Sequence, residues 1–229
     1  MAENEKIVFR NELKFLINNA EAEYLRRMLS CVMKKDSYAE EKDYYIRSLY
    51  FDTVQNRDLV EKIDGVSERR KIRLRIYDVT QEKVKLEVKN KQENYSVKET
   101  LTITAEDAKA LIAGDADILL KYQNRIANKV YAYMKKEIHN PVILIDYERE
   151  AYMLDVENVR ITFDKNVRAS TSSDMFSDKN QMVGVVKPGM CILEVKYDNF
   201  LPEHISKILA SVTMQNMSIS KYMHSRMLF

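Results

Sequence analysis

Apolar and polar residues alternate along several short segments of this chain, and the clearest alternation covers residues 71–76. Ile72, Leu74 and Ile76 occupy one set of alternate positions, and basic residues occupy the other. Because a β-strand sends successive side chains to opposite faces, the pattern predicts a strand with one apolar and one cationic face. The cations are Lys71, Arg73 and Arg75. Like charges this close repel one another, which favours a surface where an anion neutralises them.

Further segments alternate in the same way. Residues 82–91 carry four lysines and Glu87 on one side, opposite Val84, Leu86 and Val88. The polar faces of later strands carry Lys98, Thr100 and Thr102; Tyr147 and Arg149; Arg160, Thr162 and Asp164; and Glu194 and Lys196. Each strand alone is also consistent with a solvated face of an ordinary antiparallel sheet. The excess of cations favours an enclosed surface for a polyanion, as do amphipathic helices that need apolar sheet surface to pack on.

Strands and helices alternate in groups along the chain. The pattern predicts strands at 6–17, 44–53, 71–76, 82–91, 96–103, 142–152, 159–164 and 190–197. It predicts helices at 19–33, 56–63, from Thr104, 117–138, 202–213 and 218–227. This order predicts an α+β fold with an antiparallel sheet, in one domain over 1–229. About eight strands are enough to close a barrel around a small ligand, with the helices on its outer surface.

Composition narrows the class of protein. The chain has 229 residues, 45% of them hydrophobic, with a formal charge of only +2, so the cations are concentrated locally rather than spread as in a general nucleic-acid binder. Cys31 and Cys191 lie far apart without metal-ligand spacing, which favours a reducing compartment. The amino-terminal residues lack an apolar signal region, and no apolar run reaches the about 18 residues typical of a membrane span. We therefore expect a cytoplasmic protein.

Two glutamates are candidate metal ligands. A carboxylate beside a phosphate-binding cluster can bind Mg²⁺ or Mn²⁺, because hard divalent cations bridge carboxylate and phosphate oxygens. Glu194 is the first candidate and Glu12 the second. An ion pair with a neighbouring cation is the alternative interpretation of each glutamate.

Eight short motifs, in this order, resemble the catalytic domain of the vacuolar transporter chaperone (VTC) family, which belongs to the triphosphate tunnel metalloenzymes and the wider CYTH-like group. The motifs are Arg10-Asn11-Glu12-Leu13-Lys14-Phe15, Ile46-Arg47-Ser48-Leu49-Tyr50-Phe51-Asp52, Lys71-Ile72-Arg73-Leu74-Arg75 with Tyr77, Leu86-Glu87-Val88-Lys89, Tyr147-Glu148-Arg149, Arg160-Ile161-Thr162 with Asp164, Leu193-Glu194-Val195-Lys196 and Ser220-Lys221-Tyr222. Each motif alone is weak, but their order and spacing together are fairly specific over about 9–222.

The resemblance implies a barrel whose bore binds a triphosphate. It implies transfer of the γ-phosphoryl group of ATP to a growing polyphosphate chain, with Mn²⁺ or Mg²⁺ and release of ADP. By motif position, the phosphate-binding residues would be Lys14, Lys71, Arg73, Arg75, Lys89, Lys98, Arg149, Arg160 and Lys221, with Lys196, Tyr147 and Ser220 as further lining residues. Of these, Arg73, Arg75, Lys89, Arg149, Arg160 and Lys221 would serve catalysis, and Glu194 would hold the metal.

The sequence departs from the eukaryotic VTC proteins, because no transmembrane region and no amino-terminal regulatory domain are recognisable in it. A membrane-associated partner therefore stays unidentified. Residues 169–188 are polar and are expected to form a loop or lid. Three alternatives stay open beside the polymerase: a hydrolase of nucleotide or inorganic triphosphates, a non-catalytic polyphosphate-binding module, and an RNA binder. The last would need stacking aromatics between the cations, whereas the chain has no Trp.

Overall fold

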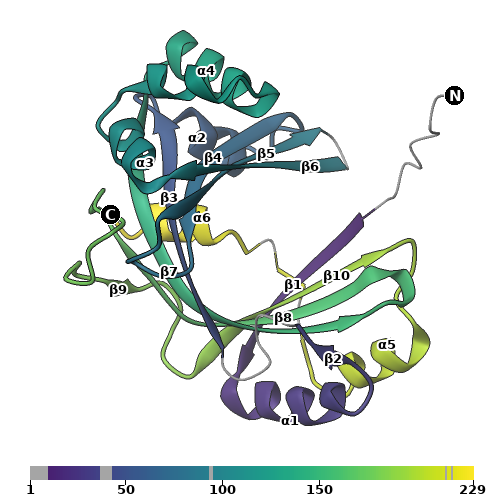
Figure 1. Ribbon diagram of the computed structural model, residues 1–229. Helices are drawn as coiled ribbons and strands as arrows, with labels where there is room; N and C mark the ends of the chain where they lie inside the picture. Colours follow the sequence, from purple (N-terminus) through teal and green to yellow (C-terminus); the bar gives the residue numbers. More distant parts are fainter. Residues whose placement is uncertain (1–9, 37–42, 93–94, 215, 218) are drawn as a thin grey trace, which may run out of the picture. The chain divides into compact units, whose positions relative to one another are not determined.

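The computed structural model describes residues 10–36, 43–92, 95–214, 216–217 and 219–229 (Figure 1). The strands are β1 (Arg10–Asn18), β2 (Lys34–Lys35), β3 (Tyr44–Thr53), β4 (Arg69–Ile76), β5 (Lys83–Gln92), β6 (Tyr95–Thr104), β7 (His139–Leu154), β8 (Val159–Ser170), β9 (Val183–Gly184) and β10 (Met190–Asp198). The helices are α1 (Asn19–Ser30), α2 (Arg57–Ile63), α3 (Ala105–Ile112), α4 (Arg125–Lys136), α5 (Glu203–Ala210) and α6 (Lys221–Arg226), with 3₁₀ helices η2 (Ala116–Tyr122) and η3 (Val156–Asn158).

The chain divides into two compact units. Unit 1 comprises residues 1–44, 148–166 and 186–219, and unit 2 comprises residues 45–147, 167–185 and 220–229. Strands β7 and β8 contribute residues to both units.

In unit 1, strands β1, β10 and β8 pair antiparallel, and helices α1 and α5 pack together on one side of them (Figure 1). The apolar side chains of the strands point to these helices and form a core with Leu25, Leu29 and Ile205. Helix α1 begins where the sequence predicts, because Asn18 accepts a hydrogen bond from the Glu21 N–H and the Glu21 side chain accepts one from Asn18. The opposite face of the strands is left for polar residues.

In unit 2, strands β3, β4, β5 and β6 pair antiparallel, and α3, η2 and α4 cover their apolar face (Figure 1). Ile72, Leu74 and Ile76 are fully buried in this core, as the alternation of residues 71–76 predicts. The single helix expected at 117–138 is wrong. Gln123 takes a left-handed conformation with φ 45°, and Asn124 then caps a new helix, so the segment divides into η2 and α4.

The α+β class and the antiparallel sheet are confirmed, but the closed barrel is not. Eight strands follow the order β1-β10-β8-β7-β3-β4-β5-β6, with β2 and β9 beside this path. Among the described residues no ladder joins β1 to β6, and closure would require one. The outer edge of β1 is instead used within unit 1, because the Met217 N–H donates to the Lys14 carbonyl at 2.8 Å and Phe15 forms a bridge with Asn216.

Candidate functional site

Unit 2 presents a row of basic residues on the strand face opposite its core. Lys71, Arg73 and Arg75 of β4 share this face, since the residues between them are buried on the other side. The register places Lys71 opposite Lys89, Arg73 opposite Glu87, Arg75 opposite Lys85, and Lys89 opposite Lys98. We call Lys71, Arg73, Arg75, Lys85, Lys89 and Lys98 the cationic face. In the described part of β4, β5 and β6, Glu87 is the sole acid on this face.

Glu87 lies at the centre of the cationic face and is 2% exposed. Arg73 donates to its Oε2 from Nε at 2.7 Å and lies 2.6 Å away through Nη2. Lys98 Nζ lies 3.2 Å from Oε1, and Arg75 Nη1 lies 3.8 Å from Oε2. Burial alone would raise the pKa of the Glu87 carboxyl, but Arg73, Arg75 and Lys98 together lower this pKa to about 2. The Glu87 carboxylate thus holds Arg73, Arg75 and Lys98 in place, and its single negative charge offsets only one of their three positive charges.

Tyrosine and serine hydroxyls hold the two arginines in place. The Arg73 Nη1 donates to the Tyr50 hydroxyl at 2.7 Å. Arg75 donates from Nε to Ser48 Oγ and from Nη2 to the Tyr147 hydroxyl, both at 3.1 Å. Side chains from two other strands therefore orient each guanidinium, which suits a group that must bind a planar or tetrahedral oxyanion with defined geometry.

Helix α6 brings the carboxy-terminal motif to the same cluster. Ser220 caps α6 by accepting a hydrogen bond from the Met223 N–H, and Lys71 Nζ lies 3.2 Å from its Oγ. Lys221 Nζ lies 4.8 Å from the centre of the Tyr147 ring. Unit 2 therefore contains seven of the predicted phosphate ligands in one connected cluster, with Lys89 beside them in register: Lys71, Arg73, Arg75, Lys98, Tyr147, Ser220 and Lys221.

The polar face of unit 1 carries two glutamates and two lysines in a quartet across β1 and β10. Glu12 is opposite Lys196, and Lys14 is opposite Glu194. Lys14 Nζ lies 3.1 Å from Glu12 and 3.7 Å from Glu194, and Lys196 Nζ lies 3.8 Å from Glu12 and also pairs with Glu194. Glu194 is 5% exposed. Opposite charges alternate, so the quartet as a whole is neutral.

The two predicted arginines of unit 1 also have carboxylate partners. Arg149 donates to both oxygens of the fully buried Asp164, at 2.6 and 2.8 Å. Arg160 Nη2 donates to Asp36 at 2.6 Å and to the Tyr44 hydroxyl at 3.0 Å. Sequence reasoning missed both Asp36 and Tyr44, and no alternation or motif marks them. Each arginine would have to share or exchange its carboxylate in order to bind phosphate.

Comparison with known proteins identifies the family. The family model named VTC domain matches residues 9–229, nearly the whole chain. The chain belongs to the VTC domain family. No curated protein matches the sequence.

One solved structure agrees with the fold of this VTC domain. A protein from Hippeastrum, described as an adenylyl cyclase candidate with a dominant triphosphatase activity, aligns with TM-score 0.55 and 17% identity over 94% of both chains. An adenylate cyclase candidate from Bacillus halodurans aligns with TM-score 0.49 and 13% identity, covering 93% of this chain and 94% of its own. In the described ranges, every helix falls short of the length and apolarity that crossing a membrane would require.

Sequence reasoning missed Ser48 and Tyr50 as residues of this VTC domain's site. A signal was present, because both alternate with the apolar Leu49 and Phe51 on β3. Of residues 169–188, expected as a loop or lid, 169–170 end β8 and 183–184 form the short strand β9, and the residues between these strands are held against unit 2. Met175 is fully buried there, and Arg47 donates to the carbonyls of Met175 and Ser177.

The donor set for a metal in this VTC domain is limited. Among the described residues no group of three or more His, Cys, Asp or Glu side chains could hold a metal ion. Glu12 and Glu194 share Lys14 and Lys196 as partners and so offer two carboxylates on one face. Mg²⁺ is commonly bound by one or two carboxylates and completed by water and substrate phosphates. The two glutamates fit such a partial site, but not a site built from protein ligands alone.

Proposed function

We propose that this VTC domain is a metal-dependent polyphosphate polymerase that transfers the γ-phosphoryl group of ATP to the end of a polyphosphate chain. The observation that carries the proposal is the cluster around Glu87, where Arg73, Arg75 and Lys98 all contact one buried carboxylate. Such a surface is costly unless anions complete it, and linked phosphates supply several negative charges at short spacing.

Phosphoryl transfer needs positioning and charge neutralisation more than covalent help from the protein. The bond between the γ-phosphorus and its bridging oxygen breaks, a terminal oxygen of the polyphosphate chain forms the new bond, and ADP leaves with the bridging oxygen. Arg73 and Arg75 are proposed to bind non-bridging oxygens through two donors each, and Lys71, Lys89, Lys98 and Lys221 to add point charges.

A divalent cation, Mn²⁺ or Mg²⁺, would be held by Glu194 and Glu12 of unit 1. When bound, it would neutralise charge on phosphate oxygens. Lys14 and Lys196 hold both carboxylates in place without it, so the glutamates are ordered before a cation arrives. Arg149 and Arg160 are proposed as further phosphate ligands from the same unit.

A second candidate is a triphosphatase, in which water replaces the phosphate chain as acceptor. The triphosphatase activity described for the Hippeastrum structure favours it, since that protein shares this fold. The same cationic face would serve both reactions, because both bind a triphosphate and differ only in the acceptor.

The decisive experiment incubates the purified protein with ATP and Mn²⁺ and measures ADP, free phosphate and long-chain polyphosphate. Long chains with matching ADP support the polymerase, and free phosphate without chains supports the triphosphatase. Neither product, together with retained binding of tripolyphosphate, would leave only a binding module.

The metal assignment is tested with Glu194→Gln. We expect it to abolish metal-dependent turnover and leave the fold intact, because Gln keeps the shape of Glu but loses the charge that a hard cation needs. Glu99→Gln is the matched control, since Glu99 is also buried and paired with two cations, Lys129 and Arg125, but lies on the other face of β6. Unchanged ATP consumption by Glu194→Gln would remove Glu194 from the mechanism.

A further inference from the structure

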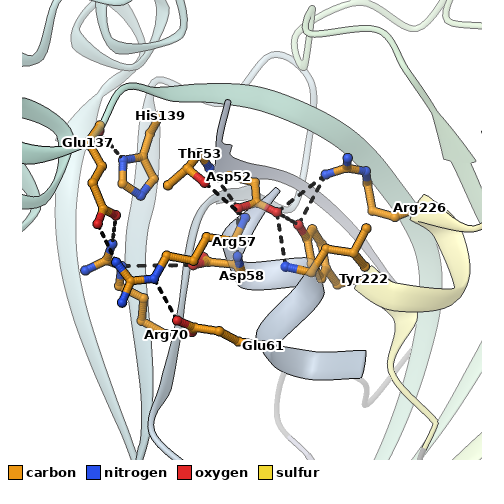
Figure 2. A network of polar contacts seen from close by, with 11 residues as sticks. Asp52, Thr53, Arg57, Asp58, Glu61, Arg70, Glu137, His139, Tyr222 and Arg226 are labelled. Atoms are coloured by element: carbon orange, nitrogen blue, oxygen red, sulfur yellow. Dashed lines mark hydrogen bonds and ion pairs between the residues drawn. The ribbon is translucent and has the colours of Figure 1, made fainter. Parts of the chain in front are cut away.

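Asp52, at the end of β3, is a fully buried carboxylate with more partners than the local backbone requires (Figure 2). Its Oδ1 accepts the N–H groups of Thr53 and Asp58 at 2.7 and 2.9 Å, and its Oδ2 accepts the N–H of Leu59 at 3.2 Å. The bonds from Asp58 and Leu59 satisfy two donors in the first turn of α2, which has no side-chain cap from Asn56. They account for the carboxylate's role in α2, but not for its remaining contacts.

The remaining contacts of Asp52 come from α6, about 170 residues later in the chain. The Tyr222 hydroxyl donates to Asp52 Oδ2, and Arg226 Nη1 lies 3.7 Å from the same oxygen (Figure 2). Arg226 also donates to the Tyr222 hydroxyl at 3.2 Å and to Asn56 Oδ1 at 2.6 Å. Both side chains of α6 that reach the buried carboxylate are thus fixed to it and to each other.

Helix α6 depends on such contacts for its position. It has only six residues, and a helix this short is not stable by itself in water. Tyr222 is 1% exposed, and the centre of its ring lies 5.2 Å from the centre of the Tyr50 ring. Lys71 Nζ lies 4.9 Å from the centre of the Tyr222 ring. Ser220 and Lys221, the residues that join the cationic face, directly precede Tyr222 in sequence.

We propose that Asp52 is a positioning residue for the cationic face: through Tyr222 and Arg226 it holds α6 so that Lys221 and Ser220 stay beside Tyr147 and Lys71. The inference rests on the proposed function, since it treats the cationic face as a triphosphate site. Burial and the hydrogen bond to Asp52 both raise the pKa of the Tyr222 hydroxyl. The phenol therefore remains a donor throughout the neutral range, and the tether does not depend on pH there.

The test is a calorimetric titration with tripolyphosphate, without metal, on Tyr222→Phe. This variant removes the hydroxyl of Tyr222. The backbone N–H groups that donate to the Asp52 carboxylate keep their hydrogen bonds. Tyr152→Phe is the matched control, because Tyr152 is equally buried and donates to a carboxylate, Glu150, at 2.8 Å, but belongs to the apolar core of unit 1. We expect about tenfold weaker binding by Tyr222→Phe, the effect of losing one charge-assisted hydrogen bond. The control should bind like wild type at a similar loss of thermal stability.

A coupling experiment separates positioning from simple loss of stability. If Asp52 acts through Lys221 and Ser220, Tyr222→Phe should cost clearly less in a Lys221→Ala background than in wild type, because one of the two positioned residues is already gone. An equal loss in both backgrounds, or wild-type affinity of Tyr222→Phe, would overturn the inference and leave the proposed function standing. Failure of wild type itself to bind tripolyphosphate would overturn both. Should Tyr222→Phe not fold, Arg226→Gln takes its place in the same cycle, since its partly exposed side chain makes the weaker of the two contacts with Asp52.

Discussion

Asp58, in the first turn of α2, makes the stability of this protein depend on pH in an unusual direction. The carboxyl is 1% exposed, and neither oxygen has a hydrogen-bond partner among the described residues. Arg70 Nε is 4.0 Å away, and the Arg70 guanidinium also pairs with Glu137 at 2.5 Å (Figure 2). Burial, and after it the neighbouring carboxylate of Asp52, raise the pKa of Asp58 to about 7. The folded protein therefore keeps this proton at a pH where the unfolded chain has released it.

The size of the effect follows from the two pKa values of Asp58. Its pKa is 3.8 in the unfolded chain and about 7 in the folded protein. Below pH 3.8 both states carry the proton, between the two values only the folded state does, and above pH 7 neither does. The free energy of unfolding contributed by Asp58 therefore falls as pH rises from about 4 to about 7, by up to about 4 kcal/mol at about 1.4 kcal/mol per pKa unit.

Asp58→Asn removes this titration and keeps the shape of the protonated side chain. The amide adds a buried donor that costs about 1–3 kcal/mol, but this cost is the same at every pH. We therefore expect the free energy of unfolding of Asp58→Asn, minus that of wild type, to rise by about 2–4 kcal/mol between pH 4 and pH 8. Burial lowers the pKa of the nearby His139, so its contribution to the free energy of unfolding changes in the opposite direction. This contribution is present at neutral pH and is lost as pH falls below about 6.5. It is common to both proteins and cancels in the difference.

The assay is urea unfolding of both proteins at several pH values from 4 to 8. Asp64→Asn serves as the control, since it removes an exposed acid that follows the same helix and leaves the buried Asp58 in place. A difference for Asp58→Asn that stays constant across this range would refute the reasoning, because it would mean that Asp58 is already ionised in the folded protein at pH 4.

Two further predictions concern arginines of unit 2. Arg73→Ala should weaken tripolyphosphate binding by about 2–4 kcal/mol, because it removes a partly buried guanidinium from beside Glu87. A calorimetric titration measures this loss, and wild-type affinity would contradict the assignment of Arg73 as a phosphate ligand. Arg47→Ala should lower the free energy of unfolding by about 3–5 kcal/mol without changing tripolyphosphate affinity, because it leaves Asp146, 1% exposed, without its two hydrogen bonds at 2.7 and 2.8 Å. Urea unfolding measures this loss, and a change below about 1 kcal/mol would contradict it.

The local elements could be predicted from sequence because their signals are local. Strict alternation at 71–76 specifies both the strand and its buried face, and Asn18 with Glu21 specifies the start of α1. Sheet closure depends on which distant segment occupies the edge of β1, and alternation contains no information about that choice. The division of 117–138 into two helices depends on the backbone of Gln123, for which apolar periodicity is equally silent.

Candidate ligands were predictable by type and face, but their partners were not. The alternation that places Arg73 and Glu87 on one face does not specify that they bond, or that Tyr50 holds the far side of the guanidinium. Asp36 and Tyr44 reach Arg160 only because the chain folds back on itself. The sequence thus predicts which strand face carries a charged side chain. Whether that side chain is already paired depends on residues that only the tertiary fold brings next to it.

The ratio of cations to acids differs between the two polar faces, and this difference assigns them different chemistry. In unit 1 the predicted cations and their carboxylates are equal in number. Lys14 and Lys196 share Glu12 and Glu194, Arg149 pairs with Asp164, and Arg160 pairs with Asp36. A neutral arrangement of this kind suits a divalent cation, whose charge two glutamates can offset once phosphate draws the lysines away. In unit 2 Glu87 contacts Arg73, Arg75 and Lys98, and its pKa of about 2 means that it stays ionised and cannot release them by taking up a proton at neutral pH. The three cations around Glu87 therefore keep a net positive charge throughout the neutral range, which is why triphosphate affinity should respond more to Arg73 than to Arg149.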